Sequence, residues 1–137
     1  MLFRSQYGIQ PQLGGRPISA ETAHILTEML SVSLEVEGSK ALVPGYSIAG
    51  KTGTAEIAGD EGYSRERTNA SFIGWGPTDD PKFIIYVWLE EPGTSIWGST
   101  TAAPVFSEIA QRIVVYLNIP PDAIRAVLNV LARRITP

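Results

Sequence analysis

Apolar residues recur at helical spacing in three stretches of the chain, and this period predicts three helices. The first runs from about residue 19 to 35, where Ser19 is placed to cap its start. The second covers residues 101–117, and two prolines end it. The third covers residues 123–137, and we expect its apolar side to pack against the rest of the domain. The apolar stripes consist of Ala23, Leu26, Met29, Leu30 and Leu34 in the first helix, and of Ile124, Val127, Leu128, Leu131 and Ile135 in the last.

The middle of the chain shows strand patterns instead. Residues 46–57 are rich in small and β-branched side chains, and residues 69–75 form a second strand-like run. Residues 83–89 are apolar without interruption, as expected for a strand that is covered on both faces. The polar residues 59–68 predict a solvated loop, and residues 77–81, with a proline at each end, predict a turn.

The order of these elements, one helix, three strands and two helices, predicts the fold class. Short connections between consecutive strands imply an antiparallel meander with helices on its faces, which is an α+β fold. At 137 residues the chain suits a single domain. Residues 1–16 carry glycine, proline and glutamine without a period, so they predict a loop-like start.

Composition narrows the classes of function. A net charge of −3 provides no broad basic surface, so we expect no nucleic-acid partner. Cysteine is absent, which excludes disulfides and thiolate zinc sites, and we expect no cofactor and no metal. The start lacks a signal-like pattern, and no apolar run approaches the roughly 18 residues that cross a bilayer. We therefore expect neither a signal nor a transmembrane segment in this chain.

One short segment, GYSIAGKTGT at residues 45–54, fits two kinds of chemistry. Residues 45–52 match the G-x-x-x-x-G-K-[ST] pattern of a phosphate-binding loop, whereas residues 51–54 contain the K-T-G element of penicillin-binding enzymes. A phosphate-binding loop needs a helix directly after its lysine, because the helix N-terminus supplies the amide donors. The residues after Lys51 are poor helix formers, so the context favours the K-T-G interpretation.

Placed in a strand at the edge of a sheet, residues 51–54 offer a site for a carboxylate. Alternate side chains share a face, so Lys51 and Gly53 point to one face, and Thr52 and Thr54 to the other. The lysine supplies a cation and the threonines supply hydroxyl donors, while Gly53 leaves room for a ligand backbone. A backbone N–H at an unpaired edge also stabilises an oxyanion.

Several segments around this strand occur in the same order as in a known family. The chain resembles the C-terminal part of the transpeptidase domain of class B penicillin-binding proteins over roughly residues 14–122, with residues 17–122 as the main part. Co-linear matches of this number are specific, whereas K-T-G alone is a weak pattern. The segments that carry the resemblance are residues 18–23, 29–30, 45–58, 70–77, 81–87, 91–92, 102–106 and 116–121.

The resemblance implies a mechanism and a role for each matching residue. In that family a serine of an S-x-x-K element attacks a D-Ala-D-Ala stem peptide or a β-lactam, and an amine then resolves the acyl-enzyme into a peptidoglycan cross-link. Lys51 would support the serine of an S-x-N element and attract the substrate carboxylate, and Thr52 and Thr54 would hydrogen-bond that carboxylate. The Thr54 N–H would form half of the oxyanion hole, and Gly53 would let the ligand lie along the strand. The parent protein would work at the extracytoplasmic face of the bacterial cell membrane.

The nucleophile itself is missing, because neither S-x-x-K nor S-x-N occurs in the 137 residues. Acyl transfer needs a nucleophile and an adjacent base, so we expect no acylation by penicillin and no cross-linking by this chain alone. The resemblance implies that the N-terminal part of the domain, with two strands of a five-stranded sheet, lies outside this chain. Without them the strand at residues 82–89 keeps an unpaired apolar edge, and we expect either self-association through it or a complementing segment.

Three alternatives stay open at this point. The first is that the chain is part of a serine β-lactamase or a β-lactam sensor, both of which share the K-T-G strand. The second is a non-enzymatic scaffold or assembly module. The third and most remote is a nucleotide-binding protein with a phosphate-binding loop. Other polar residues carry weaker expectations: a surface role without an acid partner for His24, a turn role for Asp79 and Asp80, and a modest substrate role for Arg65 and Arg67.

Overall fold

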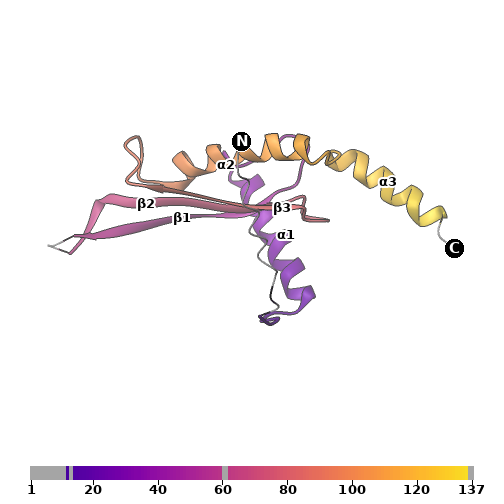
Figure 1. Ribbon diagram of the computed structural model, residues 1–137, viewed down its shortest axis with the longest axis horizontal. Coiled ribbons are helices and arrows are strands. Elements are labelled where there is room, and N and C mark those ends of the chain that lie inside the picture. Colours follow the sequence, from indigo (N-terminus) through magenta and orange to yellow (C-terminus); the bar gives the residue numbers. More distant parts are fainter. Residues whose placement is uncertain (1–11, 13, 60–61, 136–137) are drawn as a thin grey trace, which may run out of the picture.

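The computed structural model describes residues 12, 14–59 and 62–135, without the side chains of residues 59, 63–66 and 133–135. A three-stranded sheet forms the middle layer, α2 lies along one of its faces, and α1 crosses the other at a steep angle (Figure 1). This arrangement confirms the predicted α+β fold. The elements are α1 (Ala20–Val36), β1 (Ala49–Gly59), β2 (Gly62–Gly76), β3 (Phe83–Glu90), α2 (Gly98–Tyr116) and α3 (Asp122–Ile135).

Helix α1 begins where the sequence predicts it, because the Ser19 hydroxyl accepts a hydrogen bond of 3.0 Å from the Thr22 N–H. Its predicted apolar stripe is mostly uncovered, however. Leu34 is buried, whereas Leu26 is 44% exposed and Met29 is 63% exposed. Among the described helices and strands α1 lies close to β1 alone, so most of the stripe is left uncovered.

The sheet is an antiparallel meander in the order β1-β2-β3, as predicted. The predicted loop at residues 59–68 is wrong, because β1 continues to Gly59 and β2 already begins at Gly62. The backbone pairs Ala58–Tyr63 and Gly59–Gly62 extend the two strands into this polar stretch, and backbone pairing does not require the apolar alternation by which a strand is recognised in a sequence. The register shifts between Glu56 and Ile57, where β2 carries extra residues in a bulge.

The core lies between the sheet and α2. The rings of Phe72 on β2 and Phe106 on α2 lie 4.7 Å apart between centroids, and both side chains are fully buried. A Cβ atom added to Gly74 would lie 2.6 Å from Cζ of Phe106, so the glycine lets α2 approach the sheet closely. The buried cluster consists of Leu34, Ala41, Val43, Ile48, Phe72, Val87, Ala102, Ala103, Phe106 and Ala110.

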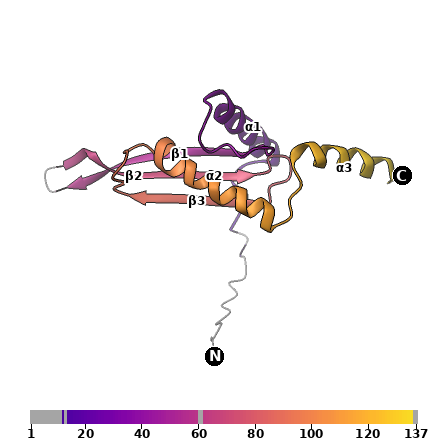
Figure 2. The ribbon, with the colours of Figure 1, turned by 90° about the horizontal axis from the view of Figure 1, so that it is seen from above.

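Strand β3 is covered on one face only, so the expectation of cover on both faces is wrong for this chain. Val87 is buried on the α2 side, and its neighbours Phe83, Ile85 and Leu89 pack against the same core. The other face is exposed, at 67% for Ile84, 61% for Tyr86 and 53% for Trp88. Helix α1 does not cover this face because it lies on the β1 side of the sheet (Figure 2).

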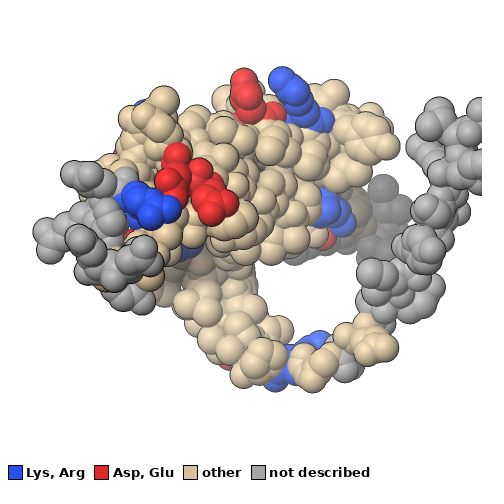
Figure 3. Space-filling model, turned by 60° about the vertical axis from the view of Figure 1, so that its left-hand side comes forward, with Lys and Arg blue, Asp and Glu red and all other residues tan. Residues whose placement is uncertain are grey.

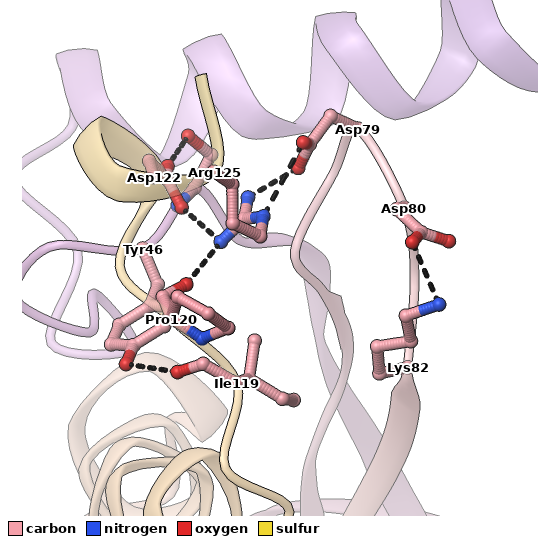
Figure 4. Close-up of polar contacts among 9 residues, drawn as sticks. Tyr46, Asp79, Asp80, Lys82, Ile119, Pro120, Asp122 and Arg125 are labelled. Atoms are coloured by element: carbon pink, nitrogen blue, oxygen red, sulfur yellow. Dashed lines mark hydrogen bonds and ion pairs between the residues drawn. The ribbon is translucent and has the colours of Figure 1, made fainter. Parts of the chain in front are cut away.

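Helix α3 projects away from the end of the sheet and packs against none of the other helices and strands within residues 14–59 and 62–135 (Figure 1). The expectation that it packs on the domain is therefore wrong. Its first turn is attached to the rest of the chain: the Asp122 carboxylate accepts a 2.6 Å hydrogen bond from the Ser47 N–H, and Arg125 forms an ion pair with Asp79 (Figure 4). Its apolar stripe is about half exposed at Ile124, Val127, Leu128 and Leu131.

Candidate functional site

The K-T-G-T segment, residues 51–54, lies in the middle of β1 at an edge of the sheet. Within the described part of the chain β1 pairs with β2 alone, with Lys51 opposite Ile73 and Gly53 opposite Ser71. The chain continues as a strand to Gly59, so no helix N-terminus follows Lys51. This geometry rules out a phosphate-binding loop.

The ladder pattern shows which amides face the open edge. The Glu91 N–H donates to the Thr68 carbonyl at 3.0 Å, one step beyond the paired residues Asn69 and Glu90. Bonding direction alternates along an antiparallel strand, so even-numbered residues of β2 bond to β3 and odd-numbered ones bond to β1. The N–H and C=O groups of Thr52 and Thr54 therefore point away from β2, toward the open edge.

The side chains of the segment lie along the same edge. The exposed Lys51 bends toward the next residue, with its Nζ 3.3 Å from Oγ1 and 3.4 Å from the carbonyl oxygen of Thr52. The Thr54 side chain turns to the α2 side, where its Oγ1 accepts a 3.3 Å hydrogen bond from the Gly98 N–H. A cation, two hydroxyls and two outward amides are thus brought together on one strand.

Two glycines fix the spacing around this strand. A Cβ atom on Gly53 would lie 2.5 Å from Oγ of Ser71, so this glycine is needed for packing inside the sheet as well as for room at the edge. A Cβ atom on Gly98, the first residue of α2, would lie 2.6 Å from the Gly53 carbonyl oxygen. Sequence reasoning missed Gly98, because this contact joins residues 45 positions apart and leaves no local signal.

Arg67 lies apart from residues 51–54, in the bulge of β2. Its Nε donates to Oε1 of Glu91 at 3.0 Å, and the bond and charge of Arg67 hold the pKa of the Glu91 carboxyl below its usual value. The adjacent Thr68 hydroxyl donates to the Ile96 carbonyl at 2.9 Å. Both contacts hold the segment between β3 and α2, so Arg67 has a structural partner. The side chain of Arg65 lies outside the described residues.

The acidic pair at residues 79–80 forms ion pairs with two basic side chains. Arg125 donates to Asp79, and this bond holds the pKa of the Asp79 carboxyl below its usual value (Figure 4). Asp80 lies 2.7 Å from Nζ of Lys82. These residues line a groove of about 960 Å³ beside α3, which shares no lining residue with the K-T-G-T segment.

The remaining charged side chains of the described residues include the one histidine of the sequence. His24 lies 3.6 Å from Oε1 of Glu28, which corrects the expectation that it has no acid partner, and both side chains are about two-thirds exposed. The described residues contain no group of three or more acids, histidines or cysteines suited to a metal. On the face in Figure 3, charges gather in small groups of mixed sign.

Comparison with known proteins identifies the family. The sequence profile of the penicillin binding protein transpeptidase domain matches residues 6–111. The chain belongs to this family. Stage V sporulation protein D of Bacillus subtilis is 40% identical over 106 residues, which make up 76% of this chain and 16% of that protein.

Solved structures of transpeptidase domains have the same arrangement. The apo transpeptidase domain of penicillin-binding protein 3 from Burkholderia pseudomallei matches with a TM-score of 0.72 and 36% identity, covering 82% of this chain and 35% of that one. Penicillin-binding protein 3 from Mycobacterium tuberculosis, complexed with ampicillin, matches with a TM-score of 0.65 and 30% identity over 76% of this chain and 26% of that one. The predicted family is therefore confirmed, and the chain spans only a small share of each relative.

None of the helices in the described residues has the length and apolar character needed to cross a membrane.

Proposed function

We propose that this chain supplies the substrate-binding strand of a penicillin-binding D,D-transpeptidase, which cross-links peptidoglycan through a serine acyl-enzyme. The observation that carries the proposal is the K-T-G-T segment on an open sheet edge, with the amides of Thr52 and Thr54 directed outward. Relatives with D,D-transpeptidase names support this class over a β-lactamase or a sensor.

Each residue of the segment has a role in this proposal. The Lys51 ammonium attracts the carboxylate of a stem peptide or a β-lactam, and the hydroxyls of Thr52 and Thr54 hydrogen-bond it. The Thr54 N–H donates to the oxyanion that forms at the attacked carbonyl, as half of an oxyanion hole. Gly53 leaves the strand surface open, so that an extended ligand lies along it.

The nucleophile, its lysine base and the second oxyanion donor come from residues outside this sequence, since it contains no S-x-x-K and no S-x-N. The chain by itself therefore binds ligand weakly and does not form an acyl-enzyme. We also propose the outer face of the bacterial cell membrane as the location of the parent protein, and the family relation supports this.

Ligand binding by the isolated chain tests the role of the strand. A soluble peptide that ends in D-Ala-D-Ala is titrated into the 15N-labelled chain, and the amide signals of Thr52 and Thr54 are expected to shift with a dissociation constant of about millimolar. Lys51→Ala abolishes the shifts, whereas Lys40→Ala, which removes a lysine from the connector before β1, leaves them unchanged. Shifts that survive Lys51→Ala contradict the proposal. A fluorescent penicillin is expected to label none of these three proteins covalently, because each lacks the nucleophilic serine.

A chimera tests the chemistry. The matching part of the Burkholderia pseudomallei transpeptidase domain is replaced by this chain, which restores a nucleophile to the strand. The chimera is expected to be acylated by the fluorescent penicillin, and Lys51→Ala slows acylation about 100-fold because it removes charge that stabilises the anionic ligand. A folded chimera that is acylated equally fast with Lys51→Ala argues against the assigned role.

A further inference from the structure

The first residue of α2 lies directly on the K-T-G-T strand. Gly98 is buried, and a Cβ atom added to it would lie 2.4 Å from the carbonyl oxygen of Ser71, 2.6 Å from that of Gly53 and 3.1 Å from the backbone nitrogen of Ser71. All three neighbours are backbone atoms of two paired strands, so they cannot make room for a side chain without disturbing the sheet. A glycine is therefore needed for α2 to begin this close to β1.

This close approach brings the Gly98 N–H to a side chain of the proposed substrate-binding strand. The N–H donates to Oγ1 of Thr54 at 3.3 Å, and Thr54 as a residue is exposed at the edge of the sheet. A hydroxyl has one proton and two lone pairs, so a bond that Oγ1 accepts leaves its proton to be donated elsewhere. Since N–H···O bonds usually measure about 2.7–3.2 Å, a small displacement of Gly98 would break this one.

The hydroxyl of Thr52 is held in a similar way. Nζ of Lys51 lies 3.3 Å from Oγ1 of Thr52, and an ammonium group only donates hydrogen bonds. The oxygens of both threonines thus accept a bond from within the chain, and both hydroxyl protons are left for a ligand. A carboxylate only accepts hydrogen bonds, whereas a carboxamide also presents N–H donors. The edge is therefore matched to a free carboxylate.

The loop before α2 and the first turn of the helix fix the place of Gly98. The buried Thr68 hydroxyl donates to the Ile96 carbonyl at 2.9 Å, two residues before Gly98. The Trp97 carbonyl accepts bonds of 3.1 Å from the N–H and 2.9 Å from the hydroxyl of Thr101. The Gly98 N–H is therefore directed at its acceptor in the absence of a ligand, which is the preorganisation that favours tight binding.

We propose that Gly98 is a positioning residue, which orients the Thr54 hydroxyl so that the strand prefers a ligand with a free C-terminal carboxylate. This role rests on the function proposed above, because it gives a cause for the selectivity of the same site. The absence of a side chain lets the helix approach, and the N–H occupies a lone pair of the Thr54 oxygen that could otherwise accept a bond from an amide. A packing role alone would instead weaken all ligands equally.

Two soluble peptides that differ only at the C-terminus measure this selectivity in the full chain. One ends in D-Ala-D-Ala with a free carboxylate, the other is its C-terminal amide, and each is titrated into the 15N-labelled protein. The unmodified chain is expected to bind the acid about tenfold more tightly than the amide. Gly98→Ala should lower this preference to about threefold, because it displaces the start of α2 and releases the Thr54 hydroxyl. Gly93→Ala in the same loop is the control and should keep the preference, since an added Cβ there has no neighbour within 4 Å.

The variant Thr54→Val shows whether Gly98 acts through the hydroxyl. It keeps the shape of the side chain and removes the oxygen, so it should also lower the preference to about threefold. The double variant should be no worse than either single one, because both substitutions remove the same contribution. In Thr54→Val the Gly98 amide should also exchange its hydrogen faster, and this measurement needs no substitution at Gly98.

The outcomes distinguish the positioning role of Gly98 from the binding role of the strand. An undiminished preference in folded Gly98→Ala, or losses that multiply in the double variant, overturns the positioning role and leaves the proposed function standing. If Gly98→Ala does not fold, faster exchange of the Gly98 amide together with a lowered preference in Thr54→Val supports the role, and unchanged exchange overturns it. If the unmodified chain shows no preference for the acid, the proposed function and the positioning role are both overturned.

Discussion

The two edges of the sheet offer different things to another molecule. β1 carries Lys51, the glycines Gly50 and Gly53, and a register shift beyond Glu56. β3 carries an unbroken apolar run with Tyr86 at its centre. A lysine and small residues discourage pairing with an arbitrary strand but leave backbone donors open to a charged ligand. The apolar edge of β3, which carries no charge between Phe83 and Leu89, instead favours pairing with a complementary strand.

The two edges of one sheet are therefore suited to different kinds of contact, a charged ligand at β1 and another strand at β3. Both edges belong to β-strands that pair with β2, and both depend on α2, which packs on the shared face of the sheet. The distinction between them arises mainly from side chains, together with the register shift of β1 beyond Glu56. Substitutions that act on the shared core should affect both edges, while those at one edge should leave the other unchanged.

The largest expected effect comes from Phe106→Ala in the shared core. Phe106 is fully buried against Phe72 and Gly74, so the substitution removes the main contact of α2 with the sheet and should cost about 3–5 kcal/mol of unfolding free energy. Urea unfolding at low protein concentration measures this. Val115→Ala, at a residue that is 74% exposed on the same helix, should change stability by less than about 0.5 kcal/mol. Similar losses of unfolding free energy in the two variants would show that the packing of α2 on the sheet does not stabilise the two edge strands.

A smaller effect is expected at the β1 edge itself. Gly53→Ala places a methyl group 2.5 Å from Oγ of Ser71, and this overpacking should cost about 1–3 kcal/mol. Ser71→Ala removes the opposing oxygen, and the Cβ atom of Ser71 would then be the neighbour at 3.9 Å, an ordinary contact. The double variant should therefore recover most of the loss. Additive losses in the double-mutant cycle would contradict the close approach between these residues.

Local signals in the sequence were sufficient for the type and order of the elements and for the K-T-G-T strand, but not for the start of β2. The Ser19 cap, the helical period and the β-branched residues near Lys51 depend on neighbours in sequence, so they predict structure directly. The uncovered face of Trp88 was not predictable, because an apolar run does not show whether its cover lies within the same chain. The start of β2 at Gly62 was missed because the polar residues there show no strand pattern. The contact of Gly98 with Gly53 depends on tertiary packing alone.

Acid should affect the attachment of α3 and leave the ladder hydrogen bonds of both edges unchanged. The pKa of Asp79 is lowered in the folded chain by the bond from Arg125, so its stabilisation is present above the usual value of 3.8 and is lost as pH falls through the lower folded value. Because Asp79 is 47% exposed, the effect should stay below about 1 kcal/mol. Asp79→Asn should remove this contribution between pH 5 and 2.5 in unfolding experiments. An unchanged pH dependence in that variant would show that the ion pair does not stabilise the fold.

The smallest effect on stability is expected from Trp88→Lys at the β3 edge. Trp88 is 53% exposed and faces away from α2, so the substitution should change the unfolding free energy of the monomer by less than about 0.5 kcal/mol. Ile85→Lys, only three residues earlier, points toward α2 and places a charge against the core, so it should be far more destabilising. Urea unfolding at low protein concentration compares the two. If Trp88→Lys destabilised the monomer as strongly as Ile85→Lys, the outer face of β3 would be covered within one chain, and the contrast between the two edges would fail. If only Ile85→Lys is destabilising, the exposed apolar face contributes nothing to the stability of the described part of the chain, and its apolar character is available for contacts with a further segment or with another molecule.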